Sequence, residues 1–171
     1  EGITSIMNIN KIDNLLKIEE NSIFFEIVES SDEQKVFNGD FIKINNELRI
    51  SNLNFGENYN YFLQDNPTYY SISWGCPIVN NVENPRKALE IILTNNDQLI
   101  EKIDGQFLFL VINKETNNIK LISDRFNGIN LFYALHNKRL ICSSSYFLLA
   151  KRLNNLKIFE WADEIIYDLI R

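Results

Sequence analysis

The chain has 171 residues, 45% of them hydrophobic, which indicates one domain with enough apolar side chains for a sizeable core. Its net charge of -6 argues against nucleic-acid binding through a basic face, and no segment has the roughly 18 apolar residues of a membrane span. The N-terminal segment lacks the basic and apolar regions of a signal peptide, so we expect a cytoplasmic protein.

The N-terminal part of the chain is expected to form strands joined by short turns. Weak alternation predicts a strand over residues 2–9, and a stronger apolar pattern predicts one over residues 22–30. Asn38-Gly39 and Asn45-Asn46 are turn signals. They predict further strands near residues 34–37, 41–45 and 47–51.

The next region combines a loop and a strand. Residues 52–68 are rich in Asn, Gly, Asp and Pro, and they are expected to form a loop. Residues 68–75 alternate as a strand, and Pro77 is expected to end its regular pairing because proline lacks a backbone donor.

The clearest helical pattern follows, over residues 84–103. Asn84 suits the cap position and Pro85 the first helical position. Asn95-Asn96 interrupts the pattern, which predicts two helices. Their apolar stripes are Ala88, Leu89, Ile92 and Leu93 in the first helix, and Leu99, Ile100 and Ile103 in the second.

The last third returns to strands and ends in helices. Residues 106–145 predict an antiparallel meander, and its nearly continuous apolar runs indicate burial on both faces. Helices are expected over residues 145–153 and from residue 160, where the pattern is cut off at Arg171 and suggests that the chain continues. The pattern predicts an α+β fold, with two antiparallel sheets and helices outside. We assign residues 1–157 to the sandwich domain and residues 158–171 to the start of a linker or helix.

Four short motifs in this last third carry a family resemblance. The segment from Ile103 to Ala150 resembles the end of the class II glutamine amidotransferase domain of asparagine synthetases, whose relatives include β-lactam synthetases and lasso-peptide cyclases. The resemblance runs over nearly the whole chain but is sharp only in the last third, and it implies a four-layer αββα sandwich of the Ntn-hydrolase type. The matching pieces are Gly105–Phe109, Asp124-Arg125, Gly128–Tyr133 and Ser143–Ser145.

The resemblance implies a lost nucleophile. In the family, an N-terminal cysteine attacks the glutamine amide, and its own α-amino group, with a pKa of about 8, acts as the base. The segment 2–9 is similar to the strand that follows this cysteine, so Glu1 falls at the nucleophile position. A carboxylate cannot form the readily hydrolysed thioester of the family reaction.

The other pocket residues are also altered. The family supports the oxyanion with an Asn side chain and a Gly N–H, and the matching residues here are Trp74 and Gly75. The indole has one donor and far more bulk than Asn, so we expect it to fill the pocket. The glutamine-binding Arg matches Arg49, and the Asp that binds the α-ammonium group matches Asn84, which lacks the negative charge.

Asp124, Arg125 and Gly128 form the second group of residues implied by the resemblance. In the family, the Asp-Arg region is structural and lies near the hinge between sheet and pocket. A buried charge is costly unless it has a partner. We therefore expect Asp124 and Arg125 to hold the turn through hydrogen bonds to the backbone.

Together these losses predict a pseudoenzyme: a catalytically degenerate domain that serves as the structural N-terminal part of an asparagine-synthetase-like amide ligase. Its expected partner is the C-terminal synthetase domain of the same protein. ATP and Mg are expected only for that domain, because its ATP-binding loop has no counterpart in this sequence. A homodimer and a bound precursor peptide stay open, and we expect no cofactor in this chain and no nucleic-acid or membrane partner.

Two rival readings stay open. One is an active enzyme with another nucleophile, Cys76 or Cys142, although both thiols suit core filler and His136 suits a surface turn. With one histidine and no CxxC pair, we expect no metal site. The other is an interaction module that binds a peptide through a cluster of aromatic residues, namely Tyr59, Tyr61, Phe62, Tyr69 and Tyr70.

A last reading is that Glu1 was engineered or left by a tag. Trp74 argues against it, because a change at the nucleophile alone would not have remodelled the oxyanion hole.

Overall fold

The computed structural model describes residues 20–29 and 41–156. The predicted strands at 2–9 and 34–37, the helix from residue 160, Glu1 and the boundary at 157/158 lie outside these residues. The described elements are β1 (Phe24–Glu29), β2 (Phe41–Lys43), β3 (Leu48–Asn54), β4 (Tyr61–Asp65), β5 (Tyr69–Val79), β6 (Val82–Glu83), α2 (Pro85–Leu93), α3 (Asp97–Ile100), β7 (Asp104–Asn113), β8 (Ile119–Ser123), β9 (Phe132–His136), β10 (Arg139–Ser143) and α4 (Tyr146–Asn155).

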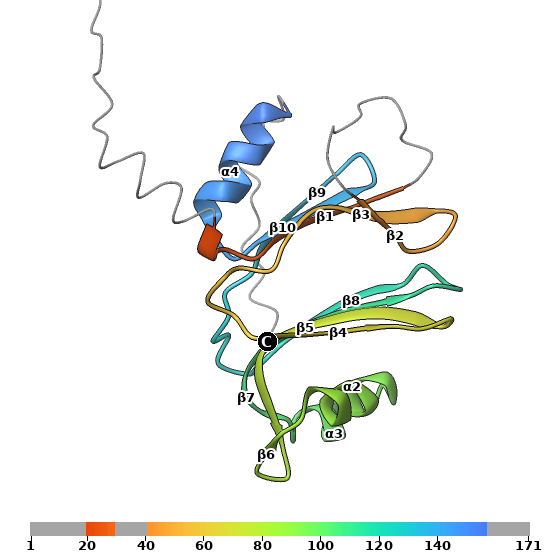
Figure 1. Cartoon of the computed structure of the whole chain (residues 1–171), viewed down its shortest axis with the longest axis vertical. Helices are drawn as coiled ribbons and strands as arrows, with labels where there is room; N and C mark the ends of the chain where they lie inside the picture. The colour runs from red at the N-terminus through yellow and green to blue at the C-terminus, as the bar shows by residue number, and fades with distance from the viewer. Residues whose placement is uncertain (1–19, 30–40, 157–171) are drawn as a thin grey trace, which may run out of the picture.

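Two antiparallel sheets face each other, which confirms that part of the prediction (Figure 1). The first sheet has the order β2-β3-β1-β10-β9. The second has the order β4-β5-β7-β8, with β6 paired to β5. The first sheet joins strands from both ends of the chain, because β1 pairs with β3 on one side and with β10 on the other.

The main core lies between the sheets, where alternate residues of each strand meet. Phe25 and Ile27 of β1 face Ile72 and Trp74 of β5, and all four are at most 2% exposed. The opposite face of β7 forms a second core: Phe107, Phe109 and Val111 pack with Leu89 and Ile92 of α2. The continuous apolar run of β7 is therefore buried on both faces, as predicted.

The two predicted helices of residues 84–103 are confirmed. Asn84 caps α2 by accepting a hydrogen bond from the Lys87 N–H at 2.9 Å. Asn95 follows the helix with φ +55°, a left-handed conformation that asparagine tolerates better than most residues. These helices lie outside the second sheet, and α4 lies outside the first (Figure 1).

The predicted four-layer αββα Ntn-hydrolase sandwich is wrong. In the described part of the chain, 47% of residues are in strands and 20% in helices. The three helices have 9, 4 and 10 residues, and α3 buries none of its side chains. Asn95 stops the helical segment after two and a half turns, so no continuous helical layer forms. The described chain is a predominantly β sandwich of two antiparallel sheets with three short helices.

Residues 52–68 differ from the predicted loop. They contain the end of β3 and all of β4, which pairs with β5 through Leu63 opposite Ile72. The loop prediction fails because β4 is a short edge strand of five residues between polar segments. The Asn and Asp residues at its two ends gave the segment the composition of a loop. The strand forms because its backbone pairs with β5.

Pro77 also differs from expectation, because β5 continues through it and pairs it with Gly105 of β7. The N and C=O of one strand residue point to the same side, and the Pro77 carbonyl accepts from the Asn84 N–H. On that side, the pairing of β5 with β4 ends at Trp74 and its pairing with β6 begins at Ile78. The N–H group that Pro77 lacks would therefore lie between the segments of β5 that pair with β4 and with β6.

The predicted single meander is divided between the sheets. β7 and β8 belong to the second sheet, whereas β9 and β10 belong to the first. The connection from Asp124 to Leu131 crosses from one sheet to the other. Sequence neighbours usually pair, but the short connection after β8 leads the chain across the core instead.

Candidate functional site

Trp74 lies inside the main core and is fully buried. Its ring stacks on Phe25, with centroids 5.8 Å apart and planes 8° apart, and its centroid lies 6.4 Å from that of Phe55. Among the described residues, the indole Nε1 has no hydrogen-bond partner. At this position the side chain fills space between the sheets.

Gly75 allows β5 and β7 to approach closely. Its φ is +86°, and a Cβ atom there would lie 2.2 Å from the Gln106 carbonyl oxygen and 3.0 Å from Ile129 Cδ1. Its N–H donates to the Asn60 carbonyl oxygen at 2.8 Å. That bond occupies the donor that an oxyanion would need.

Arg49 and Asn84 lie away from Trp74. Arg49 belongs to the other sheet, on the face opposite the buried Leu48 and Ile50, and its guanidinium lies 5.7 Å from the centre of the Phe41 ring. Asn84 caps α2 outside the second sheet. Trp74 and Gly75 are adjacent in β5, whereas Arg49 and Asn84 lie elsewhere. The structure therefore does not arrange these four residues around one pocket.

Asp124 anchors the connection that crosses between the sheets. The side chain is buried, and its Oδ2 accepts from the Phe107 N–H at 3.2 Å and the Gly128 N–H at 2.9 Å. Its Oδ1 accepts from the Phe126 N–H at 2.9 Å. Three backbone donors around one carboxylate give this ion the partners that burial requires.

The neighbours of Asp124 play different parts. The Arg125 side chain is 63% exposed and lies 4.0 Å from Asp104, so it points to the neighbouring carboxylate and not, within the described residues, to the turn backbone. Gly128 lies against the side chain of Gln106, because a Cβ atom there would come within 2.7 Å of Gln106 Cγ. The glycine lets the crossing connection pass close to β7.

Neither thiol has the surroundings of a nucleophile. Cys142 is fully buried in the main core, and burial raises the pKa of its thiol. Cys76 is half-buried, and its Sγ lies 3.9 Å from Asn60 Nδ2. His136 ends β9, where its Nε2 lies 2.8 Å from the Asn137 amide. No described thiol is hydrogen-bonded to a base, and no three described His, Cys, Asp or Glu residues group as metal ligands.

The aromatic residues named from the sequence do not form one surface. Tyr70 is buried in the main core, whereas Tyr69 packs on the opposite side, next to α2. Tyr61 is 55% exposed and stacks on Phe55 at 4.1 Å between ring centroids. Strand alternation divides the predicted cluster between two faces of the second sheet.

A carboxylate that the sequence analysis missed lies under α4. Glu26 is fully buried, and its Oε1 accepts from Arg152 Nε at 2.5 Å and from Asn52 Nδ2 at 3.2 Å. Its Oε2 accepts from Arg152 Nη2 at 3.2 Å and Arg139 Nη1 at 3.4 Å. The signal in the sequence was a single glutamate inside the apolar strand of residues 24–28.

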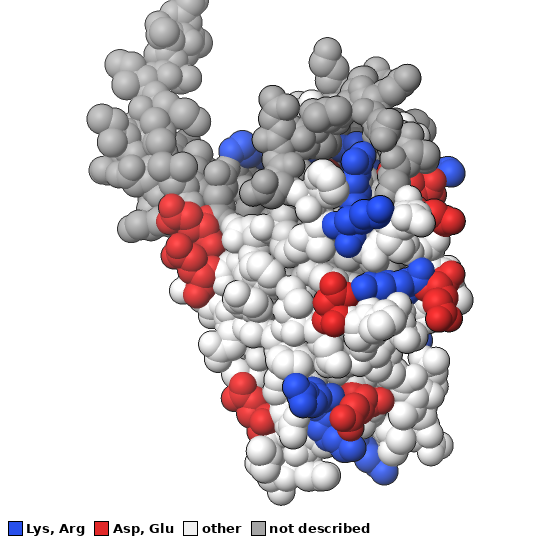
Figure 2. All heavy atoms as spheres, turned by 45° about the vertical axis from the view of Figure 1, so that its right-hand side comes forward, with Lys and Arg blue, Asp and Glu red and all other residues white. Residues whose placement is uncertain are grey.

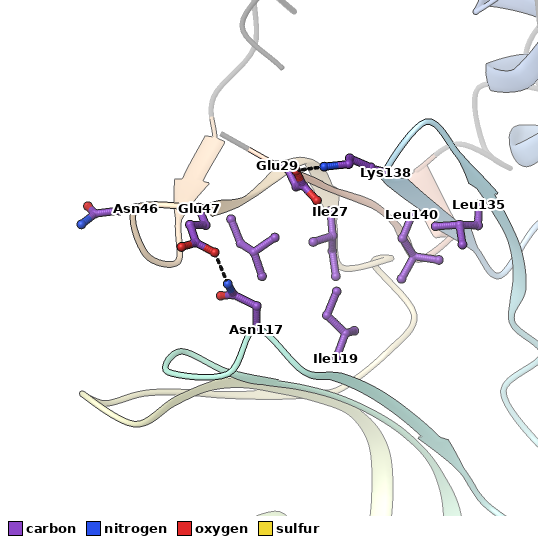
Figure 3. A pocket seen from close by; sticks show the side chains of 10 residues that line it. Ile27, Glu29, Asn46, Glu47, Asn117, Ile119, Leu135, Lys138 and Leu140 are labelled. Carbon is purple, nitrogen blue, oxygen red and sulfur yellow. Dashed lines mark hydrogen bonds and ion pairs between the residues drawn. The ribbon is translucent and has the colours of Figure 1, made fainter. Parts of the chain in front are cut away.

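One opening, the mouth cleft, lies at the end of the sandwich where three hairpin turns meet (Figure 3). It encloses about 430 Å³. The individual turns can be recognised in the sequence, but their convergence cannot. The cleft is lined by Ile27, Glu29, Asn46, Glu47, Leu48, Asn117, Ile119, Leu135, Lys138 and Leu140.

The face shown in Figure 2 has no single dominant charge. On the face in Figure 2, basic and acidic side chains lie interspersed. Within the described residues, no helix is both long enough and apolar enough to cross a membrane.

No protein-family model, curated protein or solved structure matches the chain. The resemblance to amidotransferase domains thus stays a prediction from the motifs.

Proposed function

We propose that this chain is a catalytically inactive amidotransferase-like domain, and that it forms a structural part of an ATP-dependent amide-forming enzyme of the asparagine-synthetase type. The proposal rests on the motifs of residues 105–145 and on the state of the residues at the expected pocket. It does not rest on a four-layer fold. The observation that carries it is the pair Trp74 and Gly75: the indole is packed into the core, and the glycine N–H is bonded to Asn60.

The chemical reason is that the described residues do not supply the groups that glutamine hydrolysis needs. Glutamine hydrolysis through a thioester requires an ionised thiol and donors directed at the developing oxyanion. Burial raises the pKa of the Cys142 thiol, which keeps it protonated at neutral pH. The Gly75 N–H is already used, and Asn84 supplies no charge for an α-ammonium group.

Loss of glutamine hydrolysis is compatible with amide formation elsewhere in the parent enzyme. An enzyme that adenylates a carboxylate and closes a lactam or a peptide ring takes its amine from the substrate, so it needs no ammonia. In that arrangement ATP and Mg²⁺ would bind the synthetase domain, and this chain would contribute a packing surface.

The direct test is ammonia release from glutamine. We expect the chain to release no ammonia above the rate of a buffer blank. Cys76→Ala and Cys142→Ala should give the same background as the unaltered chain. Ammonia release that Cys76→Ala abolishes would establish the rival reading, an active enzyme with a displaced nucleophile.

A second candidate function is an interaction module. The observation that favours it is the mouth cleft, which presents apolar side chains and charged groups together. In this case binding of a partner would be detectable with the chain alone, whatever the result of the ammonia assay.

A further inference from the structure

Three turns build the mouth cleft, and they come from both sheets. The β2–β3 turn contributes Asn46 and Glu47, the β7–β8 turn contributes Asn117, and the β9–β10 turn contributes Lys138. Apolar side chains from the adjoining strands point into the space between these turns (Figure 3). The cleft thus combines an apolar interior with a polar rim.

The interior is aliphatic. Ile27 and Leu48 are buried at its base, Ile119 and Leu140 are partly buried, and Leu135 is 74% exposed at its side. An exposed leucine beside an apolar cavity gains free energy when a ligand covers it. A volume of about 430 Å³ lies within the range of small-molecule sites, roughly 300–1,000 Å³.

Hydrogen bonds from Asn45 hold one side of the cleft in place. Its Nδ2 donates to the Lys114 carbonyl oxygen at 2.7 Å and to Asn117 Oδ1 at 2.6 Å, which ties a turn of the first sheet to a turn of the second. Asn117 Nδ2 in turn donates to Glu47 Oε2 at 2.5 Å. The position of the Glu47 carboxylate is therefore defined before any ligand arrives.

Of the charged residues described at the rim, Glu29 and Glu47 are acidic and Lys138 is basic. Lys138 Nζ lies 2.9 Å from Glu29 Oε2, so these two charges balance. Glu47 accepts from the neutral Asn117 amide, and no ion pair to it occurs among the described residues. A carboxylate has about four acceptor sites, so Glu47 has capacity for a cationic donor.

We propose that the mouth cleft binds an aliphatic primary ammonium group, with the hydrocarbon chain against Ile119, Leu135 and Leu140 and the ammonium beside Glu47. The same chemistry belongs to a free alkylamine and to a lysine side chain of a peptide. This inference specifies a ligand for the second candidate function. It is independent of glutamine hydrolysis, so failure of either proposal leaves the other in place.

The test is a titration of the whole chain at pH 7, followed by calorimetry and by NMR shifts of the cleft residues. The ligands are n-butylamine, n-hexylamine, 1-hexanol and hexanoate. We expect n-hexylamine to bind up to about 15-fold more tightly than n-butylamine, since each buried methylene contributes about fourfold. Hexanoate should bind more weakly than 1-hexanol, because its charge repels Glu47.

Two exposed substitutions separate the charge from the apolar wall. Glu47→Gln should weaken n-hexylamine binding by up to about fivefold, the upper end for an exposed ion pair, and leave 1-hexanol unchanged. Its matched control is Glu83→Gln on β6. Leu135→Ser should weaken both ligands, whereas Leu63→Ser, at an exposed leucine of β4, should weaken neither.

The source of the ammonium group is distinguished with acetyl-Gly-Lys-Gly-amide. Binding of this peptide as well as n-hexylamine supports a lysine side chain as the ligand, and binding of n-hexylamine alone supports a free amine. Equal affinity for n-hexylamine and hexanoate, or an unchanged amine affinity in Glu47→Gln, would overturn the proposal. So would NMR shifts that lie outside the cleft.

Discussion

At the scale of single residues, four buried side chains carry a polar atom that has no hydrogen-bond partner in the described part of the chain. Besides Trp74 Nε1 these atoms are Tyr70 Oη, Ser51 Oγ and Ser73 Oγ. An unpaired buried donor or acceptor costs about 1–3 kcal/mol because it loses its bonds to water. Each of these unpaired polar atoms therefore lowers the free energy of unfolding.

Tyr70 makes this cost measurable. Tyr70→Phe should raise the free energy of unfolding by about 1 kcal/mol at pH 8, because it removes an unpaired hydroxyl and keeps the ring. Urea unfolding of both proteins checks this. A lower stability of the phenylalanine variant would contradict it and would mean that the hydroxyl has a bonded partner.

The pH dependence of the same residue has a definite sign. Burial raises the pKa of the Tyr70 phenol from about 10 to about 12, and the Asp65 carboxylate adds to the rise. The folded state thus holds the phenol proton more tightly than the unfolded state does. The protonated phenol therefore makes its full contribution to the free energy of unfolding below pH 10, and this contribution declines as the pH rises toward 12. At pH 11 the unaltered chain should have lost about 1 kcal/mol that Tyr70→Phe does not lose. Burial of Cys142 acts equally in both proteins.

At the scale of elements, the pairing of β5 with β7 is the longest contact of the second sheet, running from Tyr69 opposite Asn113 to Ile78 opposite Asp104. Two glycines with positive φ, Gly75 and Gly105, lie where the strands come closest. A side chain at either position would meet a carbonyl oxygen of the other strand. Pairing of these two strands therefore depends on the absence of a Cβ atom.

Gly75→Ala tests this dependence. The variant should lose about 3 kcal/mol of stability, because alanine disfavours a φ of +86° and its Cβ would lie 2.2 Å from the Gln106 oxygen. Gly128→Ala is the matched control: its Cβ would meet the movable Gln106 side chain, so we expect a loss of about 1 kcal/mol. Urea unfolding measures both, and equal losses would rule out the backbone clash as the cause.

At the scale of the whole molecule, different forces attach the outer helices. Helix α2 packs on the second sheet with an apolar face, which includes Ala88, Leu89 and Ile92. Helix α4 adds a charged contact, since Arg152 reaches through to the buried carboxylate of Glu26. That carboxylate links α4 to β1, and through Arg139 to β10.

Glu26→Ala should therefore destabilise the whole molecule. The expected loss is about 3 kcal/mol, because both guanidinium groups face this carboxylate from largely buried positions. Glu90→Ala, which removes an exposed pair with Lys87, should cost less than about 1 kcal/mol. Urea unfolding gives both values, and hydrogen exchange should show faster opening of α4 in the first variant. Similar costs for the two variants would contradict a structural role of Glu26.

Much of the local structure could be predicted from the sequence. An apolar run identified β1, the turn signal at Asn45-Asn46 identified β3, and alternation identified β5. The cap at Asn84 and the break at Asn95 identified α2 and α3, because each signal acts within a few residues. Strand β4 escaped notice because its order comes from pairing with β5. The candidate site could be predicted from the sequence even less well. Arg49 and Asn84 lie apart from Trp74, and the mouth cleft brings together residues between Ile27 and Leu140 that are far apart in the chain.

The sequence alone determined that this chain forms antiparallel strands with short helices, since turn residues and side-chain periodicity constrain each segment locally. Only the tertiary structure decided that β10 pairs with β1 across more than a hundred residues, that β8 and β9 belong to different sheets, and that Trp74 faces the core. Partner choice depends on which apolar faces can be buried against each other. That is a property of the whole packed chain, and no single segment carries it.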